Sequence, residues 1–165
     1  MQFKVGYYDF SENVGMNFQL NRFYSFGALE KTELMEIGRK ATDFEKWIAL
    51  FTEAGEKAAE EGDHLKAALC FRAAQFYTLN DAKDSSGHSL KEVLYERCME
   101  HYDAYYSSFS EINYVRVPFQ NGYLPVYTVK PENPKGVIVL HGGYDSLIQE
   151  FLALLPYFGQ KGYET

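Results

Sequence analysis

The sequence predicts an α/β protein in which a helical domain precedes the first strands and the first helix of a sheet. Three observations lead to this fold class. Apolar residues recur at helical spacing over residues 28–110, and an alternating pattern with a turn signal follows over residues 111–130. Four consecutive aliphatic residues at 137–140 then run into a Gly-Gly turn, as a strand covered on both faces would.

We divide the chain of 165 residues into three regions: a leader at 1–27, a helical domain at 28–110 and the start of a sheet domain at 111–165. The leader is rich in Phe and Tyr and follows neither a strand period nor a helix period. We therefore expect an irregular segment that packs on the helices through its aromatic side chains. Some of these aromatics could instead face a substrate cleft. Arg22 could bind an acidic substrate, although an ion pair is the ordinary role of such a residue.

The helical domain opens with a helix expected over residues 28–40. Thr42 and Glu45 have capping-box spacing at the start of a second helix. Gly62 is expected to end that helix and Asp63 to cap the next one. The apolar stripes of these two helices are Trp47, Leu50, Phe51, Ala54, Ala58 and Leu65, Ala68, Leu69, Ala73, Phe76.

This alanine-rich pair of helices resembles a single tetratricopeptide-type hairpin. A solenoid needs at least about three such units, so we interpret the pair as a packing motif. Ser89 and Glu92 have capping-box spacing before a last helix, which is expected to end near residue 107.

Strand signals begin after residue 110. Val115, Val117 and Phe119 occupy alternate positions, and Asn121-Gly122 predicts a two-residue type I′ turn. Residues 124–129 form the returning strand. Pro125 cannot donate a ladder hydrogen bond, so it marks a bulge, a strand start or an unpaired side.

A glycine turn follows the aliphatic run at 137–140. Ser146 is spaced from Gln149 as a helix N-cap would be, which predicts a helix from Leu147 to about residue 161. Pro156 predicts a kink, or an end near Leu155 followed by a further turn. A strand, a glycine turn and a helix N-terminus together direct unpaired backbone N–H groups to one point, where they can hold an anion.

The unit of strand, His-Gly-Gly-Tyr-Asp-Ser and helix resembles the oxyanion-hole loop of α/β-hydrolases. It is most similar to the branch that carries a helical domain ahead of the catalytic domain. That branch includes enzymes like fermentation-respiration switch protein, dihydroxypseudooxynicotine hydrolases and polyketide-shortening hydrolases. The stretch 17–22 also resembles the N-terminal leader of these enzymes. The resemblance implies a serine hydrolase acting on an ester, amide or ketone carbonyl, with the helical domain as a cap over the cleft.

The resemblance implies that the backbone amides of Gly143 and Tyr144 are the oxyanion donors. His141, Gly142, Asp145 and Ser146 are expected to shape this loop. His141 could be a general base, but in this motif its better-supported role is to orient the loop by hydrogen bonding. A carboxylate facing an oxyanion would repel it, so we expect Asp145 to point away.

The reaction of this family needs a Gly-x-Ser-x-Gly nucleophile elbow, followed by an acid and a histidine. The sequence contains no such elbow, so no catalytic residue is assigned, and we expect a truncated N-terminal part without turnover of its own. In the resembled sheet the fourth strand lies between the second and the third. With that place empty, a gap of roughly 10 Å would separate residues 137–140 from the hairpin, or the two would collapse together.

The composition excludes several other functions. The net charge of −7 disfavours binding to nucleic acid or to anionic lipid, and no apolar run is long enough to span a membrane. We expect a cytoplasmic protein in which Cys70 and Cys98 are buried and reduced. The histidines are scattered and no motif for a metal or an organic cofactor occurs, so neither is expected; the four are His64, His88, His101 and His141.

Two rival interpretations remain beside the hydrolase. Residues 28–110 hold 16 acidic and 10 basic residues, a net charge of 6 negative, which a noncatalytic interaction protein could use to dock a basic partner. The chain could also be an inactive fragment. For the hydrolase, the expected partners are a small-molecule carbonyl substrate and possible pairing as a homodimer.

Overall fold

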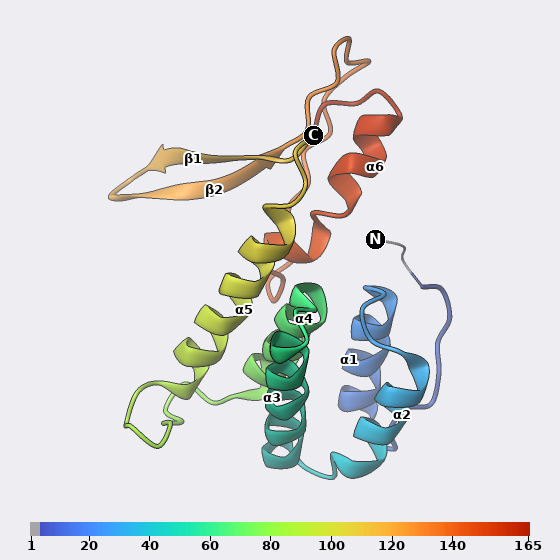
Figure 1. The fold of residues 1–165 in the computed structure, drawn as a ribbon, viewed down its shortest axis with the longest axis vertical. Coiled ribbons are helices and arrows are strands. Elements are labelled where there is room, and N and C mark those ends of the chain that lie inside the picture. Colours follow the sequence, from blue (N-terminus) through green and yellow to red (C-terminus); the bar gives the residue numbers. More distant parts are fainter. Residues whose placement is uncertain (1–3) are drawn as a thin grey trace. The chain divides into compact units, whose positions relative to one another are not determined.

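The computed structural model describes residues 4–165 and has a mixed helix and sheet fold (Figure 1). The chain divides into two compact units, Met1–Tyr105 and Tyr106–Thr165. We call them the helical unit and the strand unit and describe each by itself. The sequence-based boundary at 110/111 lies inside the strand unit.

Five helices make up the helical unit, the last of which ends one residue beyond it. They are α1 (Val14–Ser25), α2 (Lys31–Lys40), α3 (Phe44–Glu60), α4 (His64–Tyr77) and α5 (Leu90–Tyr106). The α3–α4 hairpin is the most extensive helix pair of this unit. Its buried alanines, Ala58 on α3 and Ala67 and Ala68 on α4, let the two backbones approach closely.

The core of the helical unit forms around the large side chains of α3 and α4. Trp47, Phe51 and Phe71 are fully buried, and the Trp47 indole N–H donates to the Ala73 carbonyl over 2.8 Å. Burying an aromatic side chain of this size is among the largest single contributions to a core. The predicted stripes are therefore confirmed in part. Six of their residues are buried and four are half-buried: the half-buried ones are Leu50, Ala54, Leu65 and Phe76.

The caps of these helices were predicted in part. Gly62 follows α3 with φ +75°, and the Asp63 carboxylate accepts from the Lys66 amide at the start of α4, which confirms both assignments. The Ser89 hydroxyl accepts from the Glu92 amide before α5, as predicted. The cap of α3, however, is Asp43, which accepts from the Lys46 amide over 2.8 Å; the prediction of Thr42 was wrong by one residue.

The prediction of an irregular leader was also wrong, because α1 lies within it. Met16, Leu20 and Phe23 recur at helical spacing and are buried. Two buried asparagines on α1 hid this pattern. The Asn17 carbonyl oxygen accepts from the Phe10 and Ser11 amides, and the Asn21 side chain both accepts from and donates to the backbone of Tyr8. They hold the extended segment before α1 against that helix, as a neighbouring strand would.

The strand unit contains an antiparallel hairpin of β1 (Asn113–Phe119) and β2 (Gly122–Thr128). Phe119 pairs with Gly122, so the two loop residues are Gln120 and Asn121. Gln120 has φ +50° and is the one non-glycine residue with positive φ among residues 4–165. A positive φ at the first loop position alone is typical of a type II′ turn. The predicted type I′ turn at Asn121-Gly122 was therefore misplaced by one residue.

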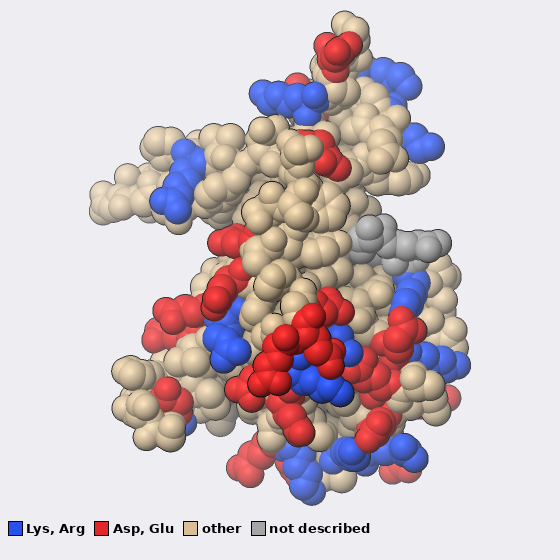
Figure 2. Space-filling view, in the orientation of Figure 1, with Lys and Arg blue, Asp and Glu red and all other residues tan. Residues whose placement is uncertain are grey.

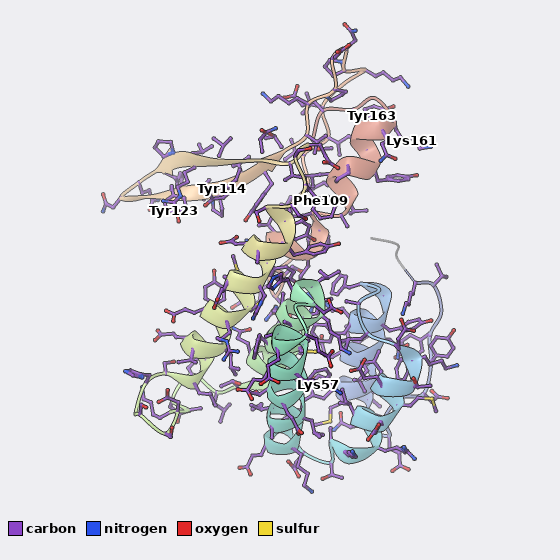
Figure 3. All side chains as sticks on the ribbon, in the orientation of Figure 1. Lys57, Phe109, Tyr114, Tyr123, Lys161 and Tyr163 are labelled. Atoms are coloured by element: carbon purple, nitrogen blue, oxygen red, sulfur yellow. The ribbon has the colours of Figure 1, made fainter. Side chains whose placement is uncertain are left out.

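All of β1 and the first half of β2 are exposed, whereas residues 126–128 are half-buried. The side of the hairpin visible in Figure 2 is mostly uncharged, and Figure 3 labels Tyr114 and Tyr123 on it. Tyr114 and Tyr127 pack at 5.0 Å between ring centroids, and the Arg116 guanidinium lies 4.7 Å from the centre of the Tyr123 ring. Val117 and Leu124 form a pair on the other face. Pro125 pairs with Arg116 inside the regular ladder, and no bulge interrupts the register.

The predicted single helix over 147–161 is two pieces. A 3₁₀-helix, η1 (Ile148–Phe151), is followed by α6 (Leu154–Gln160). Pro156 is the third residue of α6, where the backbone nitrogen has no intrahelical acceptor, so the proline begins a helix here instead of kinking one. Ser146 is not the N-cap: η1 begins after Leu147, with no side-chain cap, and Gln149 donates to the Tyr127 hydroxyl instead.

Candidate functional site

The last residues of the chain pair with two separate segments of the strand unit. Val129, just after β2, exchanges two backbone hydrogen bonds of 3.0 Å with Thr165. On the other side, the Glu164 amide donates to the Gly136 carbonyl and the Ile138 amide donates to the Glu164 carbonyl, which makes a parallel bridge between Val137 and Glu164. Residues 164–165 therefore lie between the end of β2 and the start of the 137–140 run.

This pairing corrects two predictions. The gap expected between the hairpin and the 137–140 run is not empty, because Glu164 and Thr165 lie between Val129 and Val137. The 137–140 run is neither buried nor a regular strand: Val137 forms one bridge, and the exposed fractions of Val137 and Val139 are 66% and 83%. A run of aliphatic residues is buried only where neighbouring strands and helices cover it.

The His-Gly-Gly loop follows the 137–140 run directly. Gly142 is required by close packing, since a Cβ there would lie 2.6 Å from the Ser146 Cβ. The Ser146 amide donates to the Gly143 carbonyl over 3.3 Å and closes a turn at 143–146. The His141 Nδ1 lies 2.8 Å from the Gly142 carbonyl, so His141 contacts the loop backbone. The structure thus brings His141, Gly142 and Ser146 together around the turn.

The amides of Gly143 and Tyr144 make no hydrogen bond to any residue that the structure describes. Tyr144 is fully exposed, and Gly143 and Asp145 are exposed beside it. Two neighbouring N–H groups without an acceptor are chemically able to receive an anionic oxygen.

Gly159 in α6 and Gly162 just after it pack against the segments that precede the loop. A Cβ on Gly159 would lie 2.6 Å from Val129 Cγ1, so α6 can approach the end of β2 only through a glycine. Gly162 follows α6 with φ +87° and turns the chain back into residues 163–165, of which Tyr163 is labelled in Figure 3. The Lys135 amide donates to the Gly162 carbonyl over 2.8 Å.

The helical unit holds other residues that could carry chemistry. Burial raises the pKa of the Cys70 thiol far above its ordinary value, so this cysteine is not a nucleophile. Among residues 4–165 no three His, Cys, Asp or Glu side chains gather as a metal site would require. Arg22 lies 6.0 Å from the Phe26 ring and 5.9 Å from the Phe76 ring, in the helical unit.

Sequence reasoning missed one pair of residues altogether. His64 and His101 were treated as scattered, but their Nδ1 atoms lie 3.0 Å apart. They are separated by 37 residues along the chain, so only the packing of α4 against α5 reveals the pair. No local sequence signal marks the pair.

No protein-family model and no curated protein matches the sequence. Two solved chains of AbyA5, one titled as the wild type, are similar in structure, with TM-scores of 0.60 and 0.59. Both are 18% identical to this chain, and they cover 80% and 81% of it. This chain covers only 36% and 39% of theirs, so it spans a little over a third of the AbyA5 chains. A likeness at this identity indicates a distant relationship in fold alone.

Among the described residues, no helix is both long and apolar enough to cross a membrane.

Proposed function

We propose that this chain is the N-terminal portion of a serine α/β-hydrolase and supplies its helical cap and its oxyanion loop. The observation that carries the proposal is the pairing order in the strand unit. The C-terminal residues 164–165 lie antiparallel to the end of β2 on one side and parallel to Val137 on the other. This is the order of the second, fourth and third strands in the resembled fold.

The connection between the two parallel segments also supports the proposal. After Val137 the chain passes through the glycine loop, η1 and α6 before it returns at Glu164. A strand, a helical connection and a parallel strand form the unit from which sheets of this class are built. Ligands of such sheets bind at the carboxyl ends of the strands, and residues 141–146 lie at that end.

In the proposed reaction, a serine outside this chain attacks an ester, amide or ketone carbonyl, and negative charge develops on the carbonyl oxygen. The amides of Gly143 and Tyr144 would donate to that oxygen, with a further donor from the residue after the nucleophile. His141 would keep the loop in place through its contact with the Gly142 carbonyl. No step requires a metal or an organic cofactor. The aromatic side chains of the helical unit would shape the cleft and select the substrate.

The first experiment reads the gene beyond the codon of Thr165. A Gly-x-Ser-x-Gly motif in the same frame is expected, and its absence would remove the catalytic proposal. The extended protein should then react with a fluorophosphonate probe and cleave 4-nitrophenyl acetate, whereas residues 1–165 alone should do neither.

A pair of loop variants in the extended protein tests the donors. Tyr144→Pro removes one amide hydrogen and should lower kcat by about 10²–10³, the usual effect of losing an oxyanion donor. Tyr144→Phe keeps the amide and should leave kcat unchanged. Equal activities for the two variants would exclude Tyr144 as a donor, and Gly143→Pro then tests the neighbouring amide in the same way.

A noncatalytic interaction module is the alternative, because the helical unit has a complete core of its own. Figure 2 shows acidic and basic side chains intermixed on the visible face of this unit, with no broad acidic area there. Recovery of a specific basic partner by residues 1–165, together with no esterase activity in the extended protein, would favour this alternative.

A further inference from the structure

Two histidines face each other inside the helical unit. His64 is the first residue of α4, and His101 lies on α5 with an exposed fraction of 7%. Their Nδ1 atoms are 3.0 Å apart, an ordinary length for a hydrogen bond between nitrogens. The His101 ring also stacks on Phe71 at 5.7 Å between centroids and 14° between planes, which fixes its orientation.

The ring positions identify this contact as a direct hydrogen bond. The centroids of the two imidazoles are 5.3 Å apart, about 2.3 Å more than the Nδ1–Nδ1 distance, which is close to twice the radius of an imidazole ring. The two Nδ1 atoms therefore point at each other along one line. A metal ion coordinated by both along that line would need Zn–N bonds of about 2.0–2.1 Å on each side, which 3.0 Å cannot hold.

A hydrogen bond of this kind needs one proton between two nitrogens. One ring must donate from Nδ1 while the other accepts at Nδ1. A first additional proton can go to the far nitrogen of the donor ring, and the bond then becomes charge-assisted. A second additional proton must occupy the accepting Nδ1, which removes the acceptor and places two imidazolium cations against each other.

We propose that the His64–His101 hydrogen bond is a pH-sensitive contact between the start of α4 and α5. The contact is intact while the two rings share one proton, and it breaks when both rings are protonated. Both residues lie within the helical unit, so this proposal does not rest on the proposed hydrolase activity.

The surroundings of His101 lower its pKa, which favours release on acidification. On α5, Arg97 lies over the Phe71 ring at 4.4 Å and Glu100 is adjacent to His101. At the start of α4, the Asp63 carboxylate accepts from the Lys66 backbone amide, and the Lys66 ammonium pairs with Glu33 over 2.8 Å. Desolvation by burial is the largest cause that lowers the pKa of His101. The charges of His64 and Arg97 lower it further, whereas Glu100 raises it.

The sign of the effect on stability follows. A histidine whose pKa is lower in the folded chain than in the unfolded chain binds fewer protons when folded. Its stabilising contribution is present above the unfolded pKa and is lost as the pH falls through the folded value. Acidification below about pH 6.5 should therefore weaken the attachment of α4 to α5.

The test compares urea unfolding of the 165-residue chain at about pH 7.5 and about pH 5.0, on either side of the ordinary histidine pKa. His64→Asn places a carbonyl oxygen near the original Nδ1, so it can accept from His101 but cannot be protonated. The fall in the urea midpoint on acidification should be smaller in His64→Asn than in the wild type. His88→Asn is the control, because it changes an exposed histidine beside Asp84. Its urea midpoint should fall on acidification by as much as that of the wild type.

Equal falls in the wild type and His64→Asn would overturn the proposal. If His64→Asn does not fold, nitrogen NMR of the wild-type imidazoles decides instead. The proposal requires one protonated and one bare Nδ1 at neutral pH, two separate titration steps, and faster amide exchange in α5 after the second step. Two bare Nδ1 atoms, or one ordinary titration shared by both rings, would contradict it.

Discussion

The helical unit and the strand unit use similar apolar side chains but cover them to different degrees. In the helical unit Trp47 and Phe51 are fully buried, whereas in the strand unit Val117 and Val139 are exposed to 41% and 83%. Helices satisfy their backbone hydrogen bonds locally and need a partner only for one face. Strands need partners along their edges as well as on their faces. The difference shows that a few backbone hydrogen bonds can hold an extended segment in place while its side chains stay exposed.

Removing the largest core side chain should produce the largest effect. Trp47→Ala deletes a fully buried indole and its hydrogen bond to the Ala73 carbonyl. The free energy of unfolding should fall by about 3–5 kcal/mol, as measured by urea denaturation with circular dichroism. Phe44→Ala is the control, because that ring is 50% exposed although it stacks on Tyr77 at 4.4 Å. A similar loss in both variants would show that burial does not govern this unit.

A methyl group added to each unit sharpens the comparison. At Gly38 a Cβ would lie 2.0 Å from the Phe10 carbonyl oxygen, so Gly38→Ala must displace the segment before α1 and should cost about 1–3 kcal/mol. At Gly122 a Cβ meets nothing within 4 Å, and Gly122→Ala should stay within about 0.5 kcal/mol of the wild type. Thermal unfolding measures both. An unaffected Gly38→Ala would mean that the segment before α1 does not lie where the structure places it.

The buried asparagines of α1 test whether buried polar side chains stabilise the helical unit. Asn17→Ala leaves the Phe10 amide, which is buried, without its acceptor. The expected loss is about 1–3 kcal/mol, the usual penalty for an unsatisfied buried polar group. Hydrogen exchange should also accelerate at the Phe10 and Ser11 amides. It should not change at the Met16 amide, which donates to the Asn13 side chain that caps α1. Unchanged exchange at these two amides would contradict this role.

The smallest destabilisation that should still be measurable is expected where the strand unit turns back on itself. Gly162 has φ +87°, so Gly162→Ala introduces a strained left-handed residue at about 1 kcal/mol. Exchange should become faster at the Ile138 and Thr165 amides, which depend on this turn for their pairing. The amides of the β1–β2 ladder should keep their rates. Slower hydrogen exchange throughout the strand unit would contradict the role of the Gly162 turn in this pairing.

The sequence was informative wherever local chemistry decides the structure. The helices over 44–106, the Gly62 and Asp63 boundary and the Ser89 cap follow from periodicity and capping, which act over one or two turns. The hairpin was located correctly, but its turn was misplaced by one residue, because the register depends on pairs along the whole ladder.

The residue pattern of the candidate loop predicted its turn but not its environment. Gly142 and Ser146 meet in a tight turn, in keeping with the glycine signal. The exposure of Val139 could not be predicted, since an aliphatic run specifies what a segment can bury and not whether another segment covers it. The roles of Gly143 and Tyr144 stay predictions.

The sequence by itself determined the helices over 31–40 and 44–106, the location of the hairpin and the tight turn after Gly142, because each depends on residues a few positions apart. Only the tertiary structure decided that Glu164 and Thr165 lie between Val129 and Val137, that asparagines hold the segment before α1, and that His64 meets His101. These contacts join residues separated by long loops. Their formation depends on the balance between loop closure and burial over a whole unit, which no local pattern records.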